Sequence, residues 1–225
     1  MLAPNQQSSM KRPATPTWDA LVALALYSVG VMAFLGPALF AGGALVLGHA
    51  ESDVWKHLWG AWWMGHELSA GRFPTWTDLQ NFPEGGRLYI IDPLNAGLAA
   101  LGAPLLGLVH AYNLVMAFQV LAAALAAWAL ARHLTGDGRA ALVAGAAYGF
   151  CPYILTSGVS SGIAETSNLA WLPLGVLGLL LGLSGRGGLG AILLGAAGLA
   201  LSAVGSWYFG MAALVFGILL GLWTA

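Results

Sequence analysis

Charge is what this chain has least of. Lysine, arginine, aspartate and glutamate together make up 8% of its 225 residues, whereas an ordinary soluble domain carries about 25%. Hydrophobic residues make up 59%, and the mean hydropathy is +0.78. So little charge cannot cover the surface of a soluble domain with hydrated groups. The composition therefore predicts an all-α fold, a polytopic bundle of membrane helices.

Basic residues and cysteine are also scarce. The formal net charge is −1, and no basic patch is present of the kind that binds nucleic acid, so we expect no nucleic-acid partner. The single cysteine, Cys151, cannot form an intrachain disulfide. The first apolar run, Leu21–Gly48, is longer than the roughly 7–15-residue core of a cleavable signal peptide. It is therefore predicted to be a retained membrane helix that follows a polar segment, residues 1–20.

Six apolar stretches are candidates for membrane spans, since a spanning helix needs about 20 apolar residues. A seventh, Leu94–Val109, contains Pro104 and is rich in glycine and alanine, and we expect it to be a surface or re-entrant helix. The Gly178-x-x-x-Gly182 spacing favours close packing of helices. The six predicted spans are Leu21–Gly48, Ala111–Ala131, Ala140–Thr156, Asn168–Leu183, Leu189–Ala203 and Tyr208–Thr224.

The distribution of basic residues predicts the orientation. If Leu94–Val109 stays at the surface, five of the eight bases lie on the N-terminal side, and if it crosses, only Lys11 and Arg12 do. Positive charge favours the cytoplasmic face, so we expect a cytoplasmic N-terminus, a transmembrane domain over residues 21–225 and an outer loop over residues 49–93. The chain ends at Ala225 directly after an apolar run, so we also expect it to be the N-terminal portion of a longer protein.

The outer loop, His49–Pro93, holds six of the nine acids and five of the ten tryptophans. It opens with Glu51-Ser52-Asp53, and carboxylates at the end of a membrane helix indicate function. Two carboxylates so close in sequence can share a divalent cation such as Mg²⁺ or Mn²⁺, or can shift each other's pKa so that one accepts a proton. Ordinary charge at a helix N-terminus is the alternative explanation.

Helical periodicity predicts a helix from Asp53 to Glu67. Four tryptophans and His66 fall on one face, and Asp53, His57, Gly60 and Met64 fall on the opposite face. We expect this helix to lie flat at the membrane surface, with Asp53 and His57 facing an aqueous groove. The alternative is a plain amphipathic anchor in which Asp53 and His57 form a local ion pair.

Four further polar residues are candidates. Arg72 and Arg87 are suited to bind a phosphate, although they could equally neutralise neighbouring acids or reach lipid headgroups. Asp92 precedes Pro93 and is predicted to cap a helix. Glu165 is the one acid of the predicted second outer loop, where it could approach Asp53 or cap the helix that begins near Asn168.

The order of these features resembles the GT-C superfamily of polytopic membrane glycosyltransferases. In that family the first membrane helix is followed by an acidic motif of the Asp-x-Asp or Glu-x-Asp kind, which Glu51-Ser52-Asp53 matches. Surface helices follow, as at Trp55–His66 and Leu94–Val109. The stretch from Ser52 to Pro173 is most similar to uncharacterised bacterial members. It contains the turns Arg72-Phe73-Pro74-Thr75-Trp76 and Pro83-Glu84-Gly85, the basic pair Arg132-His133 and the outer Pro152-Tyr153.

The resemblance implies transfer of a sugar from a polyprenyl-phosphate donor to a lipid, protein or glycan acceptor, on the outer face of a bacterial inner membrane. It implies Asp53 as the general base, with His57 orienting it or touching the phosphate. Glu51, together with Asp53, would hold a divalent cation, and Glu165 would orient the acceptor or help to hold the cation. Arg72 or Arg87 would stabilise the departing phosphate.

A non-enzymatic role is the competing interpretation: a transporter, a lipid-glycan flippase or an accessory subunit of envelope-glycan assembly. Transporters place ionisable residues near the middle of the bilayer and often consist of repeated halves. In this chain the acids gather at one surface, which favours surface chemistry. A structural remnant is a third interpretation.

Overall fold

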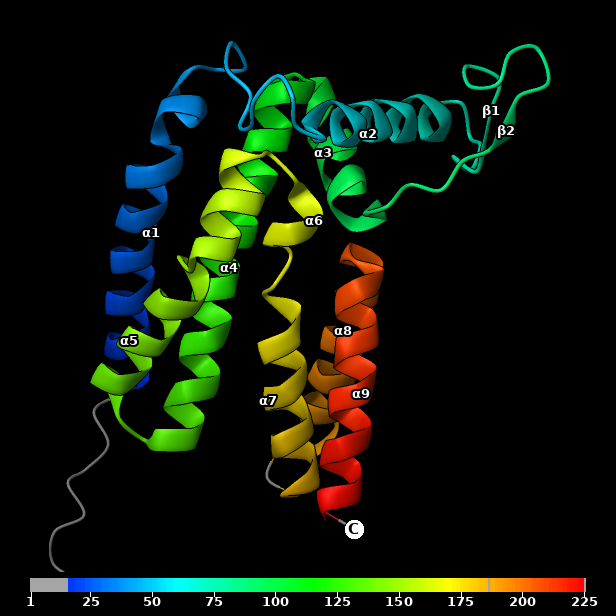
Figure 1. Cartoon of the computed structure of the whole chain (residues 1–225). Coiled ribbons are helices and arrows are strands. Elements are labelled where there is room, and N and C mark those ends of the chain that lie inside the picture. Colours follow the sequence, from blue (N-terminus) through cyan, green and yellow to red (C-terminus); the bar gives the residue numbers. More distant parts are fainter. Residues whose placement is uncertain (1–15, 186, 225) are drawn as a thin grey trace, which may run out of the picture.

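The computed structural model describes residues 16–185 and 187–224, and that part of the chain is helical apart from one short hairpin (Figure 1). The strands β1 (Trp76–Thr77) and β2 (Gly86–Arg87) pair antiparallel, with Trp76 opposite Arg87. The all-α prediction is confirmed. The helices are α1 (Pro16–Phe40), α2 (Val54–Ser69), α3 (Pro93–Leu106), α4 (Leu108–Thr135), α5 (Gly138–Gly149), the π-helix η1 (Ile154–Ser160), α6 (Ala164–Ser167), α7 (Trp171–Leu183), α8 (Gly188–Gly205) and α9 (Trp207–Thr224).

Four helical stretches of the described chain are long and apolar enough to cross a membrane: Trp18–Phe40, Leu108–Thr135, Ala164–Leu183 and Gly188–Gly205. A fifth is formed if α5 and η1, bent by 48°, are taken as one span. The prediction of a membrane helix bundle is confirmed at this level. The count of six crossings stays a prediction, and Lys11, Arg12 and Arg186, on which its orientation depends, lie outside the described residues.

Two predicted spans have different bounds in the structure. The stretch predicted as Ala140–Thr156 divides at Pro152, which has no N–H to donate and crowds the preceding turn, so α5 ends and η1 begins there. The first span ends at Phe40, well before Gly48. The chain that follows turns at Gly42 and Gly43, whose positive φ angles of 57° and 92° are incompatible with a continuing helix.

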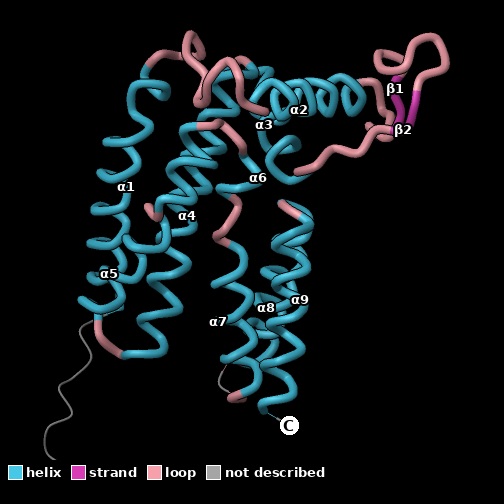
Figure 2. The backbone as a smooth tube through the Cα atoms, viewed as in Figure 1, coloured by secondary structure: helices cyan, strands magenta, loops and turns pink. Residues whose placement is uncertain are grey.

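Helix α4 is the centre of the bundle, since α1, α3, α5 and α7 all pack against it (Figure 2). Its buried face is rich in alanine, which allows close approach. Gly149 of α5 lies so near Ala124 of α4 that a side chain there would overlap it. Helices α7, α8 and α9 form a second group, joined to the first through contacts of α4 with α7 and of α3 with α8.

Two consecutive residues of α4 hold the loop after α1 and the loop after η1 in place. Asn113 accepts a hydrogen bond from the Leu47 amide (3.0 Å) and donates one to the Leu45 carbonyl (2.7 Å). Tyr112 donates to the Gly162 carbonyl at 2.6 Å. The two loops also touch each other, because Gly162 lies directly against the Leu47 carbonyl. The loop after α1 and the loop after η1 are thus fixed to one helix.

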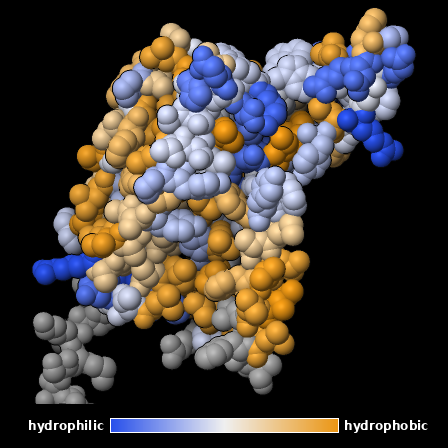
Figure 3. Space-filling model, viewed as in Figure 1, coloured by the Kyte–Doolittle hydropathy of each residue, from blue (hydrophilic) through white to orange (hydrophobic). Residues whose placement is uncertain are grey.

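Residue hydropathy follows this architecture (Figure 3). Hydrophobic side chains cover much of the outward surface of the helices, whereas hydrophilic ones gather near α2 and the hairpin. Exposed leucine, isoleucine, valine and phenylalanine side chains on α1, α8 and α9 are expected where the neighbour is lipid.

Candidate functional site

The helix predicted from Asp53 to Glu67 is confirmed as α2. The orientation of its faces differs from the expected one. His57, Gly60 and Met64 are buried, whereas Trp55 and Trp62 are exposed. Helix α2 packs against α3 and α4; its small residue Gly65 lies against Ala100 of α3, while Gly60 faces Ile90. The face with His57 therefore points into the protein rather than into open water.

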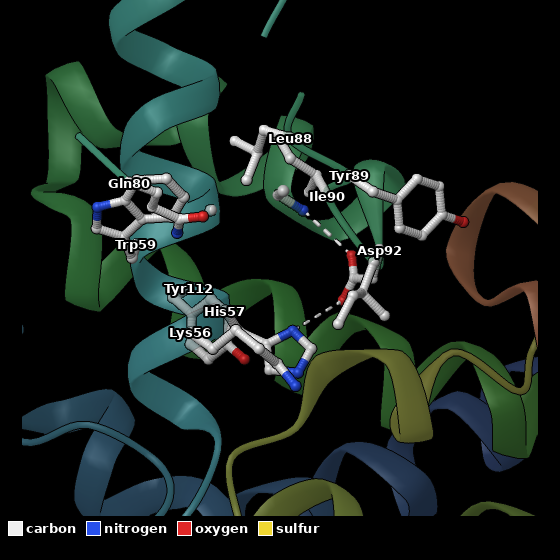
Figure 4. Close-up of a pocket in the computed structure, with 12 residues that line it drawn as sticks. Lys56, His57, Trp59, Gln80, Leu88, Tyr89, Ile90, Asp92 and Tyr112 are labelled. Atoms are coloured by element: carbon white, nitrogen blue, oxygen red, sulfur yellow. Dashed lines mark hydrogen bonds and ion pairs between the residues drawn. The ribbon is translucent and has the colours of Figure 1, made fainter. Parts of the chain in front are cut away.

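A pocket of about 220 Å³ lies beside this buried face (Figure 4). Its walls come from α2, from residues 88–91 on the way back from β2, from the start of α3 and from Tyr112 of α4. The aromatic side chains Trp59 and Tyr89 contribute to the lining. The polar side chains are Lys56, His57, Gln80, Asp92 and Tyr112. An apolar cavity with a few convergent polar groups is typical of a ligand site.

His57 and Asp92 form the centre of the pocket. The His57 Nδ1 atom lies 3.6 Å from Asp92 Oδ2, and the two side chains are 5% and 3% exposed. The other ring nitrogen, Nε2, is buried and has no hydrogen-bond partner among the described residues. A carboxylate that holds one imidazole nitrogen leaves the other free to accept a proton, so the pair is suited to general-base catalysis.

Asp92 is held rigidly because it also caps α3, as predicted. Its Oδ1 atom accepts hydrogen bonds from the backbone amides of Asn95 (3.0 Å) and Ala96 (3.3 Å). Oδ2 is thereby directed at His57. Burial raises the pKa of Asp92, while the contact with His57 and the hydrogen bonds from Asn95 oppose that rise.

A chain of buried amides continues from Asp92 into the bundle. The Asn95 side chain donates to Asp92 Oδ2 (3.4 Å) and to the Ala164 carbonyl (3.2 Å). Gln119, in the middle of α4, donates to Asn95 Oδ1 at 2.5 Å. The position of Asp92 is thus fixed by three elements, α3, α4 and α6.

The predicted acidic motif lies outside this pocket. Asp53 is 63% exposed at its side chain and accepts a hydrogen bond from Lys56 at 2.7 Å, and that bond lowers the pKa of Asp53. Glu51 is 85% exposed and faces His49 at 3.3 Å. Glu51 and Asp53 therefore have separate partners. In the described part of the chain, no group of three or more His, Cys, Asp or Glu side chains is arranged to hold a metal, and the shared cation at Glu51 and Asp53 stays a prediction.

The predicted phosphate-binding and acceptor-binding residues are dispersed. Arg72 binds both carboxylate oxygens of Glu67, at 2.9 and 2.5 Å, and so lowers the pKa of Glu67. Arg87 is exposed on β2. Glu165 of α6 interacts electrostatically with His57 and Asp92, and its Oε2 atom is buried without a hydrogen-bond partner in the described chain. Of the predicted set, His57 lines the pocket and Glu165 lies near it.

The pocket also contains residues that the sequence did not single out, among them Lys56, Gln80 and Tyr89. Asp92 was predicted only as a cap. A capping aspartate gives no local sign that its second oxygen will meet a histidine of another helix, since that depends on how α2 lies over α3. Of these residues, Lys56 could have been found from the sequence, because it is the only lysine or arginine in the predicted amphipathic helix.

Comparison with known proteins gave no match: no family model, no curated protein and no solved structure matches this chain. Its function is therefore argued from the pocket itself.

Proposed function

We propose that this chain is part of a multi-pass membrane glycosyltransferase that moves a sugar from a polyprenyl-phosphate donor to an acceptor hydroxyl at the extracytoplasmic face. The observation that carries the proposal is the pocket beside α2, in which a buried His57 faces Asp92 and its Nε2 atom, also buried, has no hydrogen-bond partner within residues 16–185 and 187–224. That pocket lies at the end of the bundle where an oily donor and a wet acceptor can meet.

In the proposed reaction, His57 Nε2 takes the proton of the acceptor hydroxyl as its oxygen attacks the anomeric carbon of the sugar. The bond from that carbon to the phosphate oxygen breaks, and the polyprenyl phosphate leaves with the electron pair. Asp92 holds the Nδ1 side of the imidazole and stabilises the positive charge that forms on the ring. This places the base at His57, rather than at the exposed Asp53.

The remaining pocket residues suit the binding of a sugar phosphate. Trp59 and Tyr89 offer ring surface to the apolar face of a sugar, and Gln80 offers an amide to its hydroxyls. Lys56 is the pocket's cation, and it stands where the charge of a departing phosphate can be stabilised. Arg72 and Arg87, which do not line the pocket, keep a proposed role as phosphate contacts, and Glu165 keeps one beside the His57–Asp92 pair.

A divalent cation enters only as an additional participant at Glu51 and Asp53. Both carboxylates are exposed and would have to leave His49 and Lys56 in order to share an ion. The reaction above is derived from the side chains of the pocket alone, and Mg²⁺ or Mn²⁺ supplies charge neutralisation if it binds there.

The membrane arrangement is also part of the proposal: α9 as a sixth crossing, the N-terminus in the cytoplasm and a bacterial inner membrane as the site. Arg132 and Arg139 lie at the end of the bundle opposite α2, where Arg132 also pairs with Asp19 of α1 at 3.2 Å. Basic residues at that end favour it as the cytoplasmic one.

The deciding experiment compares two histidine variants, His57→Gln and His49→Gln, reconstituted in nanodiscs with a radiolabelled polyprenyl-phosphate sugar. Loss of a positioned base reduces turnover by about 10²–10⁴-fold, so we expect that loss in His57→Gln. His49 is exposed and lies outside the pocket, so His49→Gln should retain activity. Wild-type turnover in His57→Gln, with a normally folded protein, would refute the role of the pair.

A transporter or flippase is the second candidate, and one observation favours it. The helices are interrupted at Pro152 and again at Asn168, and the buried amides Asn113, Gln119 and Asn168 lie inside the bundle. Discontinuous helices of this kind are typical of transporters. Proteoliposomes that move a lipid-linked sugar between leaflets without transferring it to an acceptor would establish that function, or an accessory role in it.

A further inference from the structure

The hairpin and its connections, residues 70–91, leave α2 as an arm that projects sideways from the outer end of the bundle (Figure 1). We call this segment the hairpin arm. Its surface is apolar for a segment that folds away from the core: the side chains of Phe73 and Phe82 are each 83% exposed, and Trp76, Leu79 and Tyr89 are more than half exposed. Five large apolar side chains on one short arm need a neighbour other than water.

The fold itself supplies that neighbour. Helix α9 exposes Met211, Leu214, Val215 and Ile218 along its length, so lipid must continue on that side of the bundle. At its outer end the rings of Trp207 and Tyr208 are in tilted contact, with centroids 4.3 Å apart, and exposed tryptophan and tyrosine mark the level of the membrane–water interface. In the view of Figure 1 the arm projects to the side of the bundle on which α9 lies, and it stands beyond the outer end of α9.

The composition of the arm fits an interface rather than a buried protein contact. Its apolar residues alternate with exposed polar ones, Asp78, Gln80, Asn81 and Glu84, so apolar and hydrated groups can lie side by side at the headgroups. The acids Asp78 and Glu84 are balanced by Arg72 and Arg87. Attraction to anionic lipid is therefore not required.

We propose that the hairpin arm inserts Phe73, Trp76, Leu79 and Phe82 into the headgroup region of the outer leaflet. The arm also supplies Gln80 and residues 88–91 to the pocket. Its insertion consequently holds one wall of the pocket at the level of the lipid headgroups, whatever ligand the pocket takes.

The test uses a fluorescent reporter that senses both water and lipid. In a Cys151→Ser background, which removes the single cysteine, Phe82→Cys is labelled with an NBD group and the protein is placed in nanodiscs of neutral phosphatidylcholine. We expect blue-shifted emission that is quenched by lipid with a nitroxide on its choline headgroup. Glu84→Cys, two residues away and polar, is the matched control, and its emission should be less blue-shifted than that of Phe82→Cys.

Water-like emission that nitroxide lipid does not quench would overturn the proposal. Blue-shifted emission without quenching would also overturn it, because the neighbour would then be protein, such as a second copy of the chain. If Phe82→Cys fails to fold, Phe73→Cys at the base of the arm gives the same reading, since its side chain is equally exposed. None of these results depends on whether the protein transfers a sugar.

Discussion

Asp53 and Asp92 both stand at the start of a helix, yet their surroundings are opposite. Asp53 is exposed and bound to Lys56, so it is ionised and solvated, whereas Asp92 is buried against His57. Charge at a helix N-terminus is favourable in both cases. The difference arises from tertiary packing, because α3 begins beneath α2, whereas α2 begins at the surface. Only the buried aspartate is placed to act on a neighbouring base.

The raised pKa of Asp92 makes a prediction about stability. A carboxyl whose folded-state pKa lies above its unfolded value stabilises the fold at low pH and loses that contribution as pH rises through the folded pKa. Asparagine caps a helix about as well as aspartate but does not ionise. The melting temperature of Asp92→Asn, relative to wild type, should therefore increase as pH rises above about 4. Thermal unfolding in detergent across a pH series measures this, and a falling difference would contradict it.

The pKa of Glu67 is shifted in the opposite direction to that of Asp92. Its hydrogen bonds from Arg72 lower the pKa of Glu67, so the pair stabilises the fold above the unfolded pKa and is lost as pH falls through the folded one. The pair joins the end of α2 to the start of the hairpin arm. We expect amide exchange in the arm, corrected for its intrinsic pH dependence, to accelerate below about pH 4. In Glu67→Gln the arm should exchange fast at every pH, and a pH-dependent step in that variant would exclude Glu67 as its source.

At the scale of elements, α7 and α8 are joined through glycine. Gly178 lies against the backbone of Gly195, and Gly175 lies against Gly198. The Gly178-x-x-x-Gly182 spacing predicted such packing, but only Gly178 makes the close contact. A side chain at Gly182 would meet its nearest neighbour, Ile192, at 3.7 Å, which is ordinary contact.

This difference predicts unequal costs for the same substitution. Gly178→Ala forces two backbones apart and should destabilise the protein by about 1–3 kcal/mol, the usual cost of overpacking. Gly182→Ala should be neutral or slightly stabilising, because alanine is the better helix former. Unfolding of the two variants in mixed micelles with a titrated denaturing detergent measures both, and equal costs would show that α7 and α8 pack differently.

Much of this element structure was predictable, because long apolar runs and helical periodicity are local signals. The helices at α2, α3, α4 and α8 begin and end within a few residues of their predicted bounds. What failed depended on tertiary packing or on backbone geometry. The inward orientation of His57 follows from small residues on α2 meeting α3. The early end of α1 follows from the positive φ angles of Gly42 and Gly43.

For the whole molecule, the sequence predicted an all-helical bundle with helices long and apolar enough to cross a membrane, and that much is confirmed for the described residues. The pairing of His57 with Asp92 was not predictable, since no local pattern shows that residues so far apart in sequence will meet. Orientation and the number of crossings stay predictions, because apolar length alone does not tell which end faces the cytoplasm.

Orientation can be tested with two single-cysteine variants in the Cys151→Ser background. Glu84 is exposed on the hairpin arm, and Ser184 is exposed at the turn between α7 and α8, at the opposite end of the bundle. A membrane-impermeant maleimide added to intact bacterial cells that express the protein, with the outer membrane opened, should label Glu84→Cys and spare Ser184→Cys. Labelling of Ser184→Cys alone would invert the topology and place the pocket in the cytoplasm.

The attachment of the loops after α1 and η1 to Asn113 and Tyr112 has a mechanical consequence. Neighbouring side chains of α4 form hydrogen bonds with both loops. We therefore expect that neither loop can move away from the bundle without the other, so that the two loops move together. Gln80 and Tyr89, which belong to the hairpin arm, also line the cavity. We therefore expect a ligand to enter the cavity from the side, past the hairpin arm, rather than through an opening between the two loops.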